Sequence, residues 1–382
     1  MQRFLDDNFI LTTETAKKLY HSYAAKMPII DYHCHVSPRE IYEDKRFNNI
    51  TEVWLSGDHY KWRLMRSNGV DEYYITGDAD PREKFRKFAE TLPLAIGNPM
   101  YHWCHLELKN YFGYEGILNS ATADEVYDLC AEKLKSDNMS VRGLIKQSNV
   151  VFIGTTDDPC DSLEYHKLLA EDKSMEATVA PSFRPDKALN IDKDGWSEYI
   201  QKLSEVSGVE IRDVESLKKA LGSRIEYFNA CGCRASDHGL DYAFFAEASE
   251  TNINAVLERG LAGEKIPSAE AEPLKTELLL FCAAEYAKLG WVMQIHYNCL
   301  RNPNSKAFRQ LGADTGFDCI GPNSSAAIPK LLDRLYSTDT LPKTVLYSLD
   351  PGDNQFLDCI IGAFQGSGVQ GKLQHGSAWW FN

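Results

Sequence analysis

The chain has 382 residues, of which 43% are hydrophobic and 25% charged, and its net charge is −14. This composition is typical of a globular protein rather than a disordered one. The negative charge argues against a nucleic-acid-binding surface, which needs a basic stripe. A small anionic substrate remains possible, because a few local cations can dominate the field inside a cleft.

The sequence also bears on location. It shows no signal-peptide pattern at its first residues and no apolar run long enough to span a membrane. The ten cysteines are scattered rather than densely spaced, which is typical of reduced thiols. We therefore expect a cytoplasmic protein without a membrane partner.

The first predicted strand carries a pair of histidines. Residues 1–27 predict a short helical lead-in, and an apolar run at 28–30 then leads through Asp31 into His33 and His35. Residues i and i+2 of a strand share a face, so both imidazoles would project side by side from the strand end. Such a pair is the beginning of a divalent metal site, although a His-x-His triplet also occurs by chance.

Residues 38–148 contain no convincing strand, and apolar residues recur there at helical spacing, for example in 85–92 and 123–134. We expect a helical insertion over one end of the core. From residue 149 onward, short β-rich runs alternate with amphipathic helical stretches, which predicts a parallel sheet. The further strands are expected at 149–157, 177–184, 233–238, 291–298, 344–350 and 373–380.

With the first strand, these runs make seven, whereas a TIM barrel has eight. Polar residues fall at the predicted carboxyl ends of the strands, where barrel active sites lie. An Asp in this place is often only a helix N-cap, and a single His is often a core residue. The strand-end residues are His33, His35, Asp157, Asp158, Arg184, Asp237, His238, His296, Asp350, Trp379 and Trp380.

Several sequence blocks resemble the uronate (glucuronate) isomerase family of the amidohydrolase superfamily, in matching order along the whole chain. The most specific is Gly-Asp-His-Tyr-Lys-Trp-Arg at 57–63. The others are Asp-Tyr-His-Cys-His-Val-Ser-Pro at 31–38, Asn-Pro-Met-Tyr-His-Trp-Cys-His-Leu-Glu-Leu at 98–108, Thr-Thr-Asp-Asp-Pro-Cys-Asp-Ser-Leu-Glu-Tyr-His at 155–166, Ser-Phe-Arg-Pro-Asp-Lys at 182–187 and Gly-Ser-Ala-Trp-Trp-Phe at 376–381.

The resemblance implies a single (β/α)8 TIM-type barrel domain over residues 1–382, with the helical insertion at about 38–148. It also implies interconversion of D-glucuronate with D-fructuronate, and of D-galacturonate with D-tagaturonate, by proton transfer through an enediol. The implied catalytic residues are His59, Tyr60, Asp237 and His296, and Trp379 would contact the substrate.

Aldose–ketose isomerisation needs an acid and a base and an electrophile for the enediolate. One divalent metal at His33 and His35, with Zn²⁺ as the expected ion, suits the electrophile. The sugar carboxylate needs a cation, ideally a guanidinium. We expect Arg184 to bind this carboxylate, with Arg301 as the second candidate.

One departure from the family matters. Its members continue past Trp-Trp-Phe through a strand with Thr-Asp-Ser-Arg, whose Asp is a metal ligand and the base. Neither that Asp nor that Arg is present here, so we expect a truncated sequence without strand eight, a weakly held metal and reduced or no activity. The alternatives are completion by another chain, a metal-dependent hydrolase on the same barrel, or an inactive sugar-acid binder. We also expect a homo-oligomer.

Overall fold

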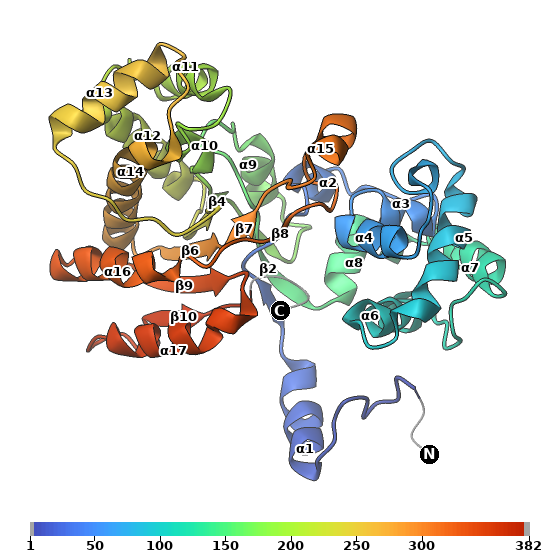
Figure 1. Cartoon of the computed structure of the whole chain (residues 1–382). Helices are drawn as coiled ribbons and strands as arrows, with labels where there is room; N and C mark the ends of the chain where they lie inside the picture. Colours follow the sequence, from blue (N-terminus) through green and yellow to red (C-terminus); the bar gives the residue numbers. More distant parts are fainter. Residues whose placement is uncertain (1–3, 378–382) are drawn as a thin grey trace.

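The computed structural model describes residues 4–377. Its centre is a set of parallel strands surrounded by helices (Figure 1). A strand forms in each of the seven predicted segments, and the segment 177–184 is split into two strands at Pro181. The parallel strands are β1 (Ile29–Asp31), β2 (Val150–Gly154), β3 (Thr178–Ala180), β4 (Ser182–Phe183), β5 (Ala235–Gly239), β6 (Val292–Tyr297), β9 (Lys343–Ser348) and β10 (Leu373–His375).

The strands are arranged in chain order. One sheet has the order β1-β2-β3 and the other has the order β4-β5-β6-β9-β10, and every pair in them is parallel. A parallel bridge between Asp157 and Phe183 joins the end of β2 to β4. The α/β class and the parallel pairing are therefore as predicted. β1 and β10 are outer strands of the two sheets, and closure into a barrel stays a prediction.

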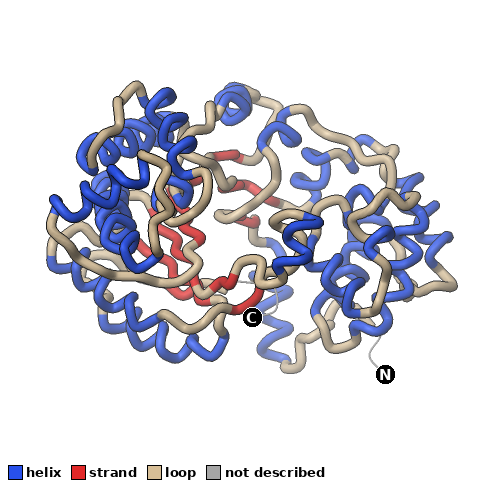
Figure 2. Tube along the Cα trace, turned by 45° about the horizontal axis from the view of Figure 1, so that its top comes forward, coloured by secondary structure: helices blue, strands red, loops and turns tan. Residues whose placement is uncertain are grey.

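Helices cover the outside of the strands in the left-hand part of Figure 2. The main core lies between these helices and β4 to β10, and Phe183, Phe228, Tyr286 and Trp291 are completely or almost completely buried there. The helices are α9 (Glu164–Glu171), α10 (Asp186–Leu189), α11 (Trp196–Ser207), α12 (Val214–Ala230), α13 (Glu250–Leu261), α14 (Ser268–Leu289), α16 (Ile328–Ser337) and α17 (Asn354–Ala363).

An arm between β6 and α16 was not predicted from the sequence. It consists of the antiparallel strands β7 (Cys299–Leu300) and β8 (Cys319–Ile320) with helix α15 (Ser305–Leu311) between them. Two-residue strands leave no alternating pattern that a sequence can reveal. The arm reaches from the parallel strands toward the helical part of the molecule (Figure 1).

Residues 38–148 form helices and turns without a strand, as predicted. They make up the right-hand part of Figure 2 and bury a hydrophobic cluster of their own around Phe85, Phe88 and Cys104. Helix α5 shows why such a segment becomes helical, because Asp80 caps its N-terminus and Pro81 occupies its first turn. The helices are α2 (Pro38–Tyr42), α3 (Ile50–Leu55), α4 (His59–Ser67), α5 (Pro81–Thr91), α6 (Pro99–Glu107), α7 (Ala123–Lys133) and α8 (Val141–Gln147).

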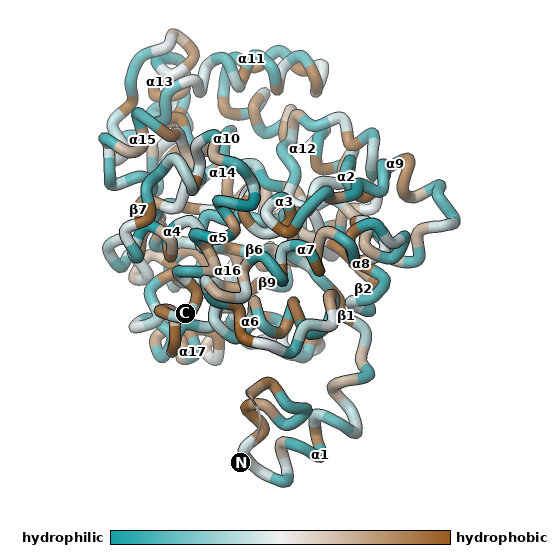
Figure 3. The backbone as a smooth tube through the Cα atoms, turned by 90° about the vertical axis from the view of Figure 1, so that its right-hand side faces the viewer, coloured by the Kyte–Doolittle hydropathy of each residue, from teal (hydrophilic) through white to brown (hydrophobic). Residues whose placement is uncertain are grey.

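The predicted helical lead-in contains helix α1 (Glu14–Ser22), which begins where the Thr13 side chain accepts a hydrogen bond from the Ala16 amide. Helix α1 itself extends away from the rest of the chain (Figure 3), and none of its residues is buried. Among residues 4–377, no helix is both long and apolar enough to cross a membrane.

Candidate active site

The two histidines predicted to bind a metal ion lie just after strand β1. It ends at Asp31, two residues earlier than predicted, so His33 and His35 lie in the loop that follows it. The Cys34 amide donates to the carbonyl of Gly154 at the end of β2, which fixes this loop. The rings of His33 and His35 lie 5.2 Å apart between centroids.

His33 lies beside two residues of the neighbouring strands. One atom each of His33, Asp237 on β5 and His296 on β6 lie within 4.8 Å of one another, close enough to surround a metal ion. The Asp237 carboxylate lies 3.0 Å from Nδ1 of His296 and 3.9 Å from Nδ1 of His33. The structure thus places a residue predicted as a metal ligand next to two that were predicted as catalytic. His35 is adjacent but outside this group, and its role as a ligand stays a prediction.

The electrostatics of this group fit a divalent cation. Burial lowers the pKa of His33 to about 4, so the imidazole is neutral at pH 7 and keeps a lone pair for a ligand. Burial alone would raise the pKa of Asp237, but His296 and Arg184 hold it below its usual value. Within the described part of the chain, Nδ1 of His33 is buried without a hydrogen-bond partner. Two imidazoles and a carboxylate are a donor set that zinc accepts.

Arg184 follows β4 and points into the same cluster. Its Nε lies 2.8 Å from Oδ2 of Asp186, and its Nη1 lies 3.1 Å from Oδ2 of Asp237. The predicted carboxylate-binding cation therefore lies beside the candidate metal group. It is already paired with two carboxylates, which the sequence did not indicate.

His59 and Tyr60 begin helix α4, whose first amides are capped by the Asp58 carboxylate. Partial burial lowers the pKa of His35, and the charge of Arg184 lowers it further. Burial and the charge of Asp58 raise the pKa of Tyr60 to about 12.

The unpredicted arm holds α4 in place. The guanidinium of Arg66 donates to the carbonyl of Thr315 at 2.5 Å and lies 4.4 Å from the ring centre of Phe317. Arg301, predicted as the second carboxylate-binding residue, follows β7 and pairs with Asp318 at 2.7 Å. It thus stabilises the arm. Trp379 lies outside the described residues.

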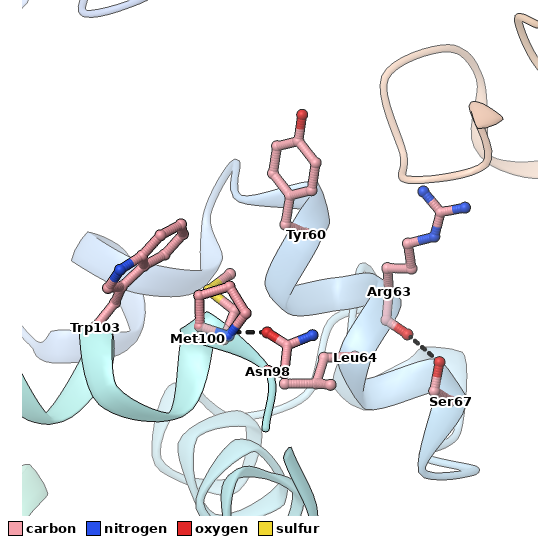
Figure 4. A pocket seen from close by; sticks show the side chains of 8 residues that line it. Tyr60, Arg63, Leu64, Ser67, Asn98, Met100 and Trp103 are labelled. Atoms are coloured by element: carbon pink, nitrogen blue, oxygen red, sulfur yellow. Dashed lines mark hydrogen bonds between the residues drawn. The ribbon is translucent and has the colours of Figure 1, made fainter. Parts of the chain in front are cut away.

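A cavity of about 320 Å³ lies between α4 and α6 (Figure 4). Of the predicted site residues it contains only Tyr60, so we do not take it as the centre of the site. Figure 4 shows the Tyr60 ring and the Arg63 guanidinium projecting to the same side, away from Met100. The lining residues are Tyr60, Arg63, Leu64, Ser67, Asn98, Pro99, Met100 and Trp103.

Sequence reasoning missed three polar residues that support the site. Tyr347 stacks on His296, with ring centroids 4.1 Å apart, and its hydroxyl donates to Gln294 at 2.8 Å. Asp186 binds Arg184 as described above. The alternation of side chains along a strand could have revealed Gln294 and Tyr347. Gln294 and His296 on β6 share a face, and Tyr347 is the β9 residue that pairs with His296.

The comparisons with known proteins decide the family. A model of the glucuronate isomerase family matches residues 1–382. The chain belongs to this family. It is 54% identical to a uronate isomerase of Lachnospira eligens and 55% identical to one of Lachnoclostridium phytofermentans, covering 100% of this chain and 82% of each relative.

Solved structures agree with this assignment. A uronate isomerase from Thermotoga maritima matches with a TM-score of 0.93 at 33% identity, over 100% of this chain and 82% of that one. A glucuronate isomerase from Caulobacter crescentus matches with a TM-score of 0.89 at 27% identity, over 100% of this chain and 80% of that one. The resemblance found in the sequence blocks is thus confirmed, and the chain is an isomerase of metal-dependent type.

Proposed function

We propose that this chain catalyses the aldose–ketose isomerisation of D-glucuronate to D-fructuronate, and of D-galacturonate to D-tagaturonate. Membership of the glucuronate isomerase family supports the reaction. The observation that supports a site is a cluster of four residues from both sheets: Arg184 after β4, Asp237 on β5, His296 on β6 and His33 after β1. A guanidinium beside a metal-binding group can hold a sugar carboxylate and leave the sugar hydroxyls near the metal.

The chain's own residues fit the proton transfers between C2 and C1. Tyr60, with a pKa raised to about 12, is protonated at neutral pH and can donate to oxygen or relay a proton near C1. Asp237 is ionised and buried, so it orients His296 and can accept a hydrogen bond from a sugar hydroxyl. His59 and His296 would bind substrate oxygens.

His33, His35, Asp237 and His296 would hold a divalent metal ion, and zinc is the expected ion. When bound, it would polarise the carbonyl and the adjacent hydroxyl of the sugar and stabilise the developing negative charge. The neutral state of His33, whose pKa is lowered to about 4, supports this role because a protonated imidazole cannot bind a metal.

We also propose that the parallel strands belong to a single (β/α)8 barrel domain that carries residues 38–148 as its helical insertion. The parallel pairing of the strands in their order along the chain supports this fold. The predicted active-site residues would then surround the carboxyl ends of the strands, where barrel enzymes bind substrates.

A cytoplasmic location is supported by ten cysteines that are all free, as expected in a reducing compartment. The homo-oligomer stays a prediction that light scattering during gel filtration can test. The substrate is a small uronic acid.

Incubation of the zinc-loaded protein with D-glucuronate tests the reaction. We expect ketose signals of D-fructuronate in the NMR spectrum, and exchange of the C2 proton with solvent deuterium. Glucuronate binding without ketose would favour the sugar-acid binder, and release of a hydrolysis product from an ester or amide would favour the metal-dependent hydrolase. If the protein neither binds nor converts D-glucuronate, that result would contradict the proposal.

A further inference from the structure

Asp186 is the first residue of α10 and lies two positions after Arg184. Its Oδ2 lies 2.8 Å from Nε of Arg184 and accepts the backbone N–H of Gly239 at 2.9 Å. The Asp186 side chain is 14% exposed, so water competes little for these bonds. One carboxylate oxygen therefore joins the guanidinium to the last residue of β5.

Gly239 leaves the space that the guanidinium fills. A Cβ atom at this position would lie 2.0 Å from Nη2 and 3.0 Å from Cζ of Arg184. Contacts below 3 Å between non-bonded atoms of this kind do not persist, so any side chain here would displace the guanidinium. The obstacle is the end of a flexible side chain rather than backbone, so the displacement would alter the site more than the fold.

The guanidinium is thus held on three sides. Asp186 binds Nε, Asp237 binds Nη1, and the backbone of Gly239 lies against Nη2. A free arginine side chain loses much rotamer freedom when it binds a ligand. Fixing it beforehand removes that cost from the binding of an anion and sets the direction of its remaining donors.

We propose that Asp186 and Gly239 are positioning residues that orient Arg184 for the carboxylate of the substrate. This inference rests on the proposed function, because it assigns the uronate carboxylate to Arg184. Neither residue touches the substrate in this proposal, and both act through the guanidinium. They would therefore contribute to the preference for sugar acids over uncharged sugars.

A double-mutant cycle separates positioning from a merely structural role. D186N removes the charge, and we expect it to raise the KM for D-glucuronate about tenfold with a smaller change in kcat, as for the loss of one charge-assisted contact. G239A leaves the Asp186 carboxylate unchanged but crowds the guanidinium that it binds, and it should raise KM in the same direction. In the background of Arg184→Met, both substitutions should have almost no further effect on KM. Equal effects in the two backgrounds would overturn the proposal.

A spectroscopic measurement tests the positioning without turnover. The Nε–H signal of Arg184, assigned by its loss in Arg184→Met, should be protected from solvent exchange in the wild type. It should shift and exchange faster in both D186N and G239A. An unchanged signal in both variants would overturn the proposal even if the enzyme is active, whereas a wild type that neither binds nor converts glucuronate would contradict the proposed function instead.

The chain offers a matched control. Asp172 pairs with Arg142 at 2.7 Å with comparable partial exposure, but it follows α9 at the end of the strands opposite to the site. D172N removes a carboxylate from an Arg–Asp pair in the same way. It should leave both KM and the Arg184 signal unchanged, and a change equal to that of D186N would also overturn the proposal.

Discussion

A buried polar network of Thr155, Asp157 and His166 supports the backbone of Arg184. The Thr155 hydroxyl donates to Asp157 Oδ2 at 2.6 Å and lies 2.7 Å from Nε2 of His166. The backbone carbonyl of Asp157 accepts the amide of Arg184 at 2.9 Å. Because the hydroxyl has only one hydrogen, it accepts from Nε2 of His166 when it donates to Asp157.

This network predicts a pH dependence of stability. Burial lowers the pKa of His166 to about 4, whereas an unfolded histidine has a pKa near 6.5. Between these values the unfolded chain binds a proton that the native chain does not, so the contribution of His166 to stability falls as the pH decreases from about 6.5 to about 4. Asp157, whose pKa burial raises to about 6, contributes in the opposite direction in both the wild type and a His166 variant. At pH 5 the loss from this one residue is about 2 kcal/mol.

His166→Gln isolates this effect, because the glutamine amide can still donate to Thr155 but does not titrate. Urea unfolding at pH 7.5 and pH 5 should show that the wild type loses about 2 kcal/mol more than the variant. His21→Gln, at an exposed position of α1, should behave like the wild type. Equal losses in the wild type and His166→Gln would mean that His166 is protonated in the native state.

Much of the candidate site could be predicted at this scale, for a physical reason. Carboxyl ends of parallel strands meet at one edge, so polar residues that follow each strand come together. Arg184 and His33 follow β4 and β1, and they meet Asp237 and His296 of β5 and β6. The carboxylates around Arg184 could not be predicted, because the hydrogen bonds of Asp186 depend on how α10 leaves β4.

At the scale of elements, a buried ion pair fixes the longest helix. Nζ of Lys275 on α14 lies 2.5 Å from Oδ1 of Asp192, and the two side chains are only 3% and 5% exposed. Asp192 lies between α10 and α11, so the pair ties α14 to the segment that follows Arg184. Removing one partner would leave the other charge buried and uncompensated.

Lys275→Met should therefore lower the free energy of unfolding by about 3 kcal/mol. Lys288→Met, on the same helix, removes a lysine that is 67% exposed and paired with Glu285, and it should cost less than about 1 kcal/mol. Urea unfolding of both variants measures the difference. Similar losses would show that water reaches the Lys275 pair.

Elements differ in how well the sequence reveals them. The strands β6 and β9 each have six residues, most of them buried, and their positions were predicted within a residue or two. The arm of β7, α15 and β8 was missed, because its strands have two residues each and pair through tertiary contacts alone. It nevertheless contacts α4, the helix that begins with His59 and Tyr60, through Arg66.

At the scale of the whole molecule, the candidate metal group joins parts of the chain that are far apart in sequence. His33 follows β1 of the first sheet, whereas Asp237 and His296 belong to β5 and β6 of the second. No local pattern predicts this meeting, which requires the parallel strands to be assembled first. An ion bound there would join both sheets.

Metal binding should therefore stabilise the whole fold, because the unfolded chain has no such group. With free zinc at about one hundred times its dissociation constant, the stabilisation is about 2.7 kcal/mol, which calorimetry should detect as a higher Tm that EDTA reverses. His33→Ala should abolish the shift, whereas His21→Ala, far from the group, should retain it. The same Tm with zinc and with EDTA, or an undiminished shift in His33→Ala, would contradict a metal site at His33. A shift that depends on His33 would mean that one ion couples the folding of β1 to that of β5 and β6, so chelation would remove the ion and part of the stability of the fold together.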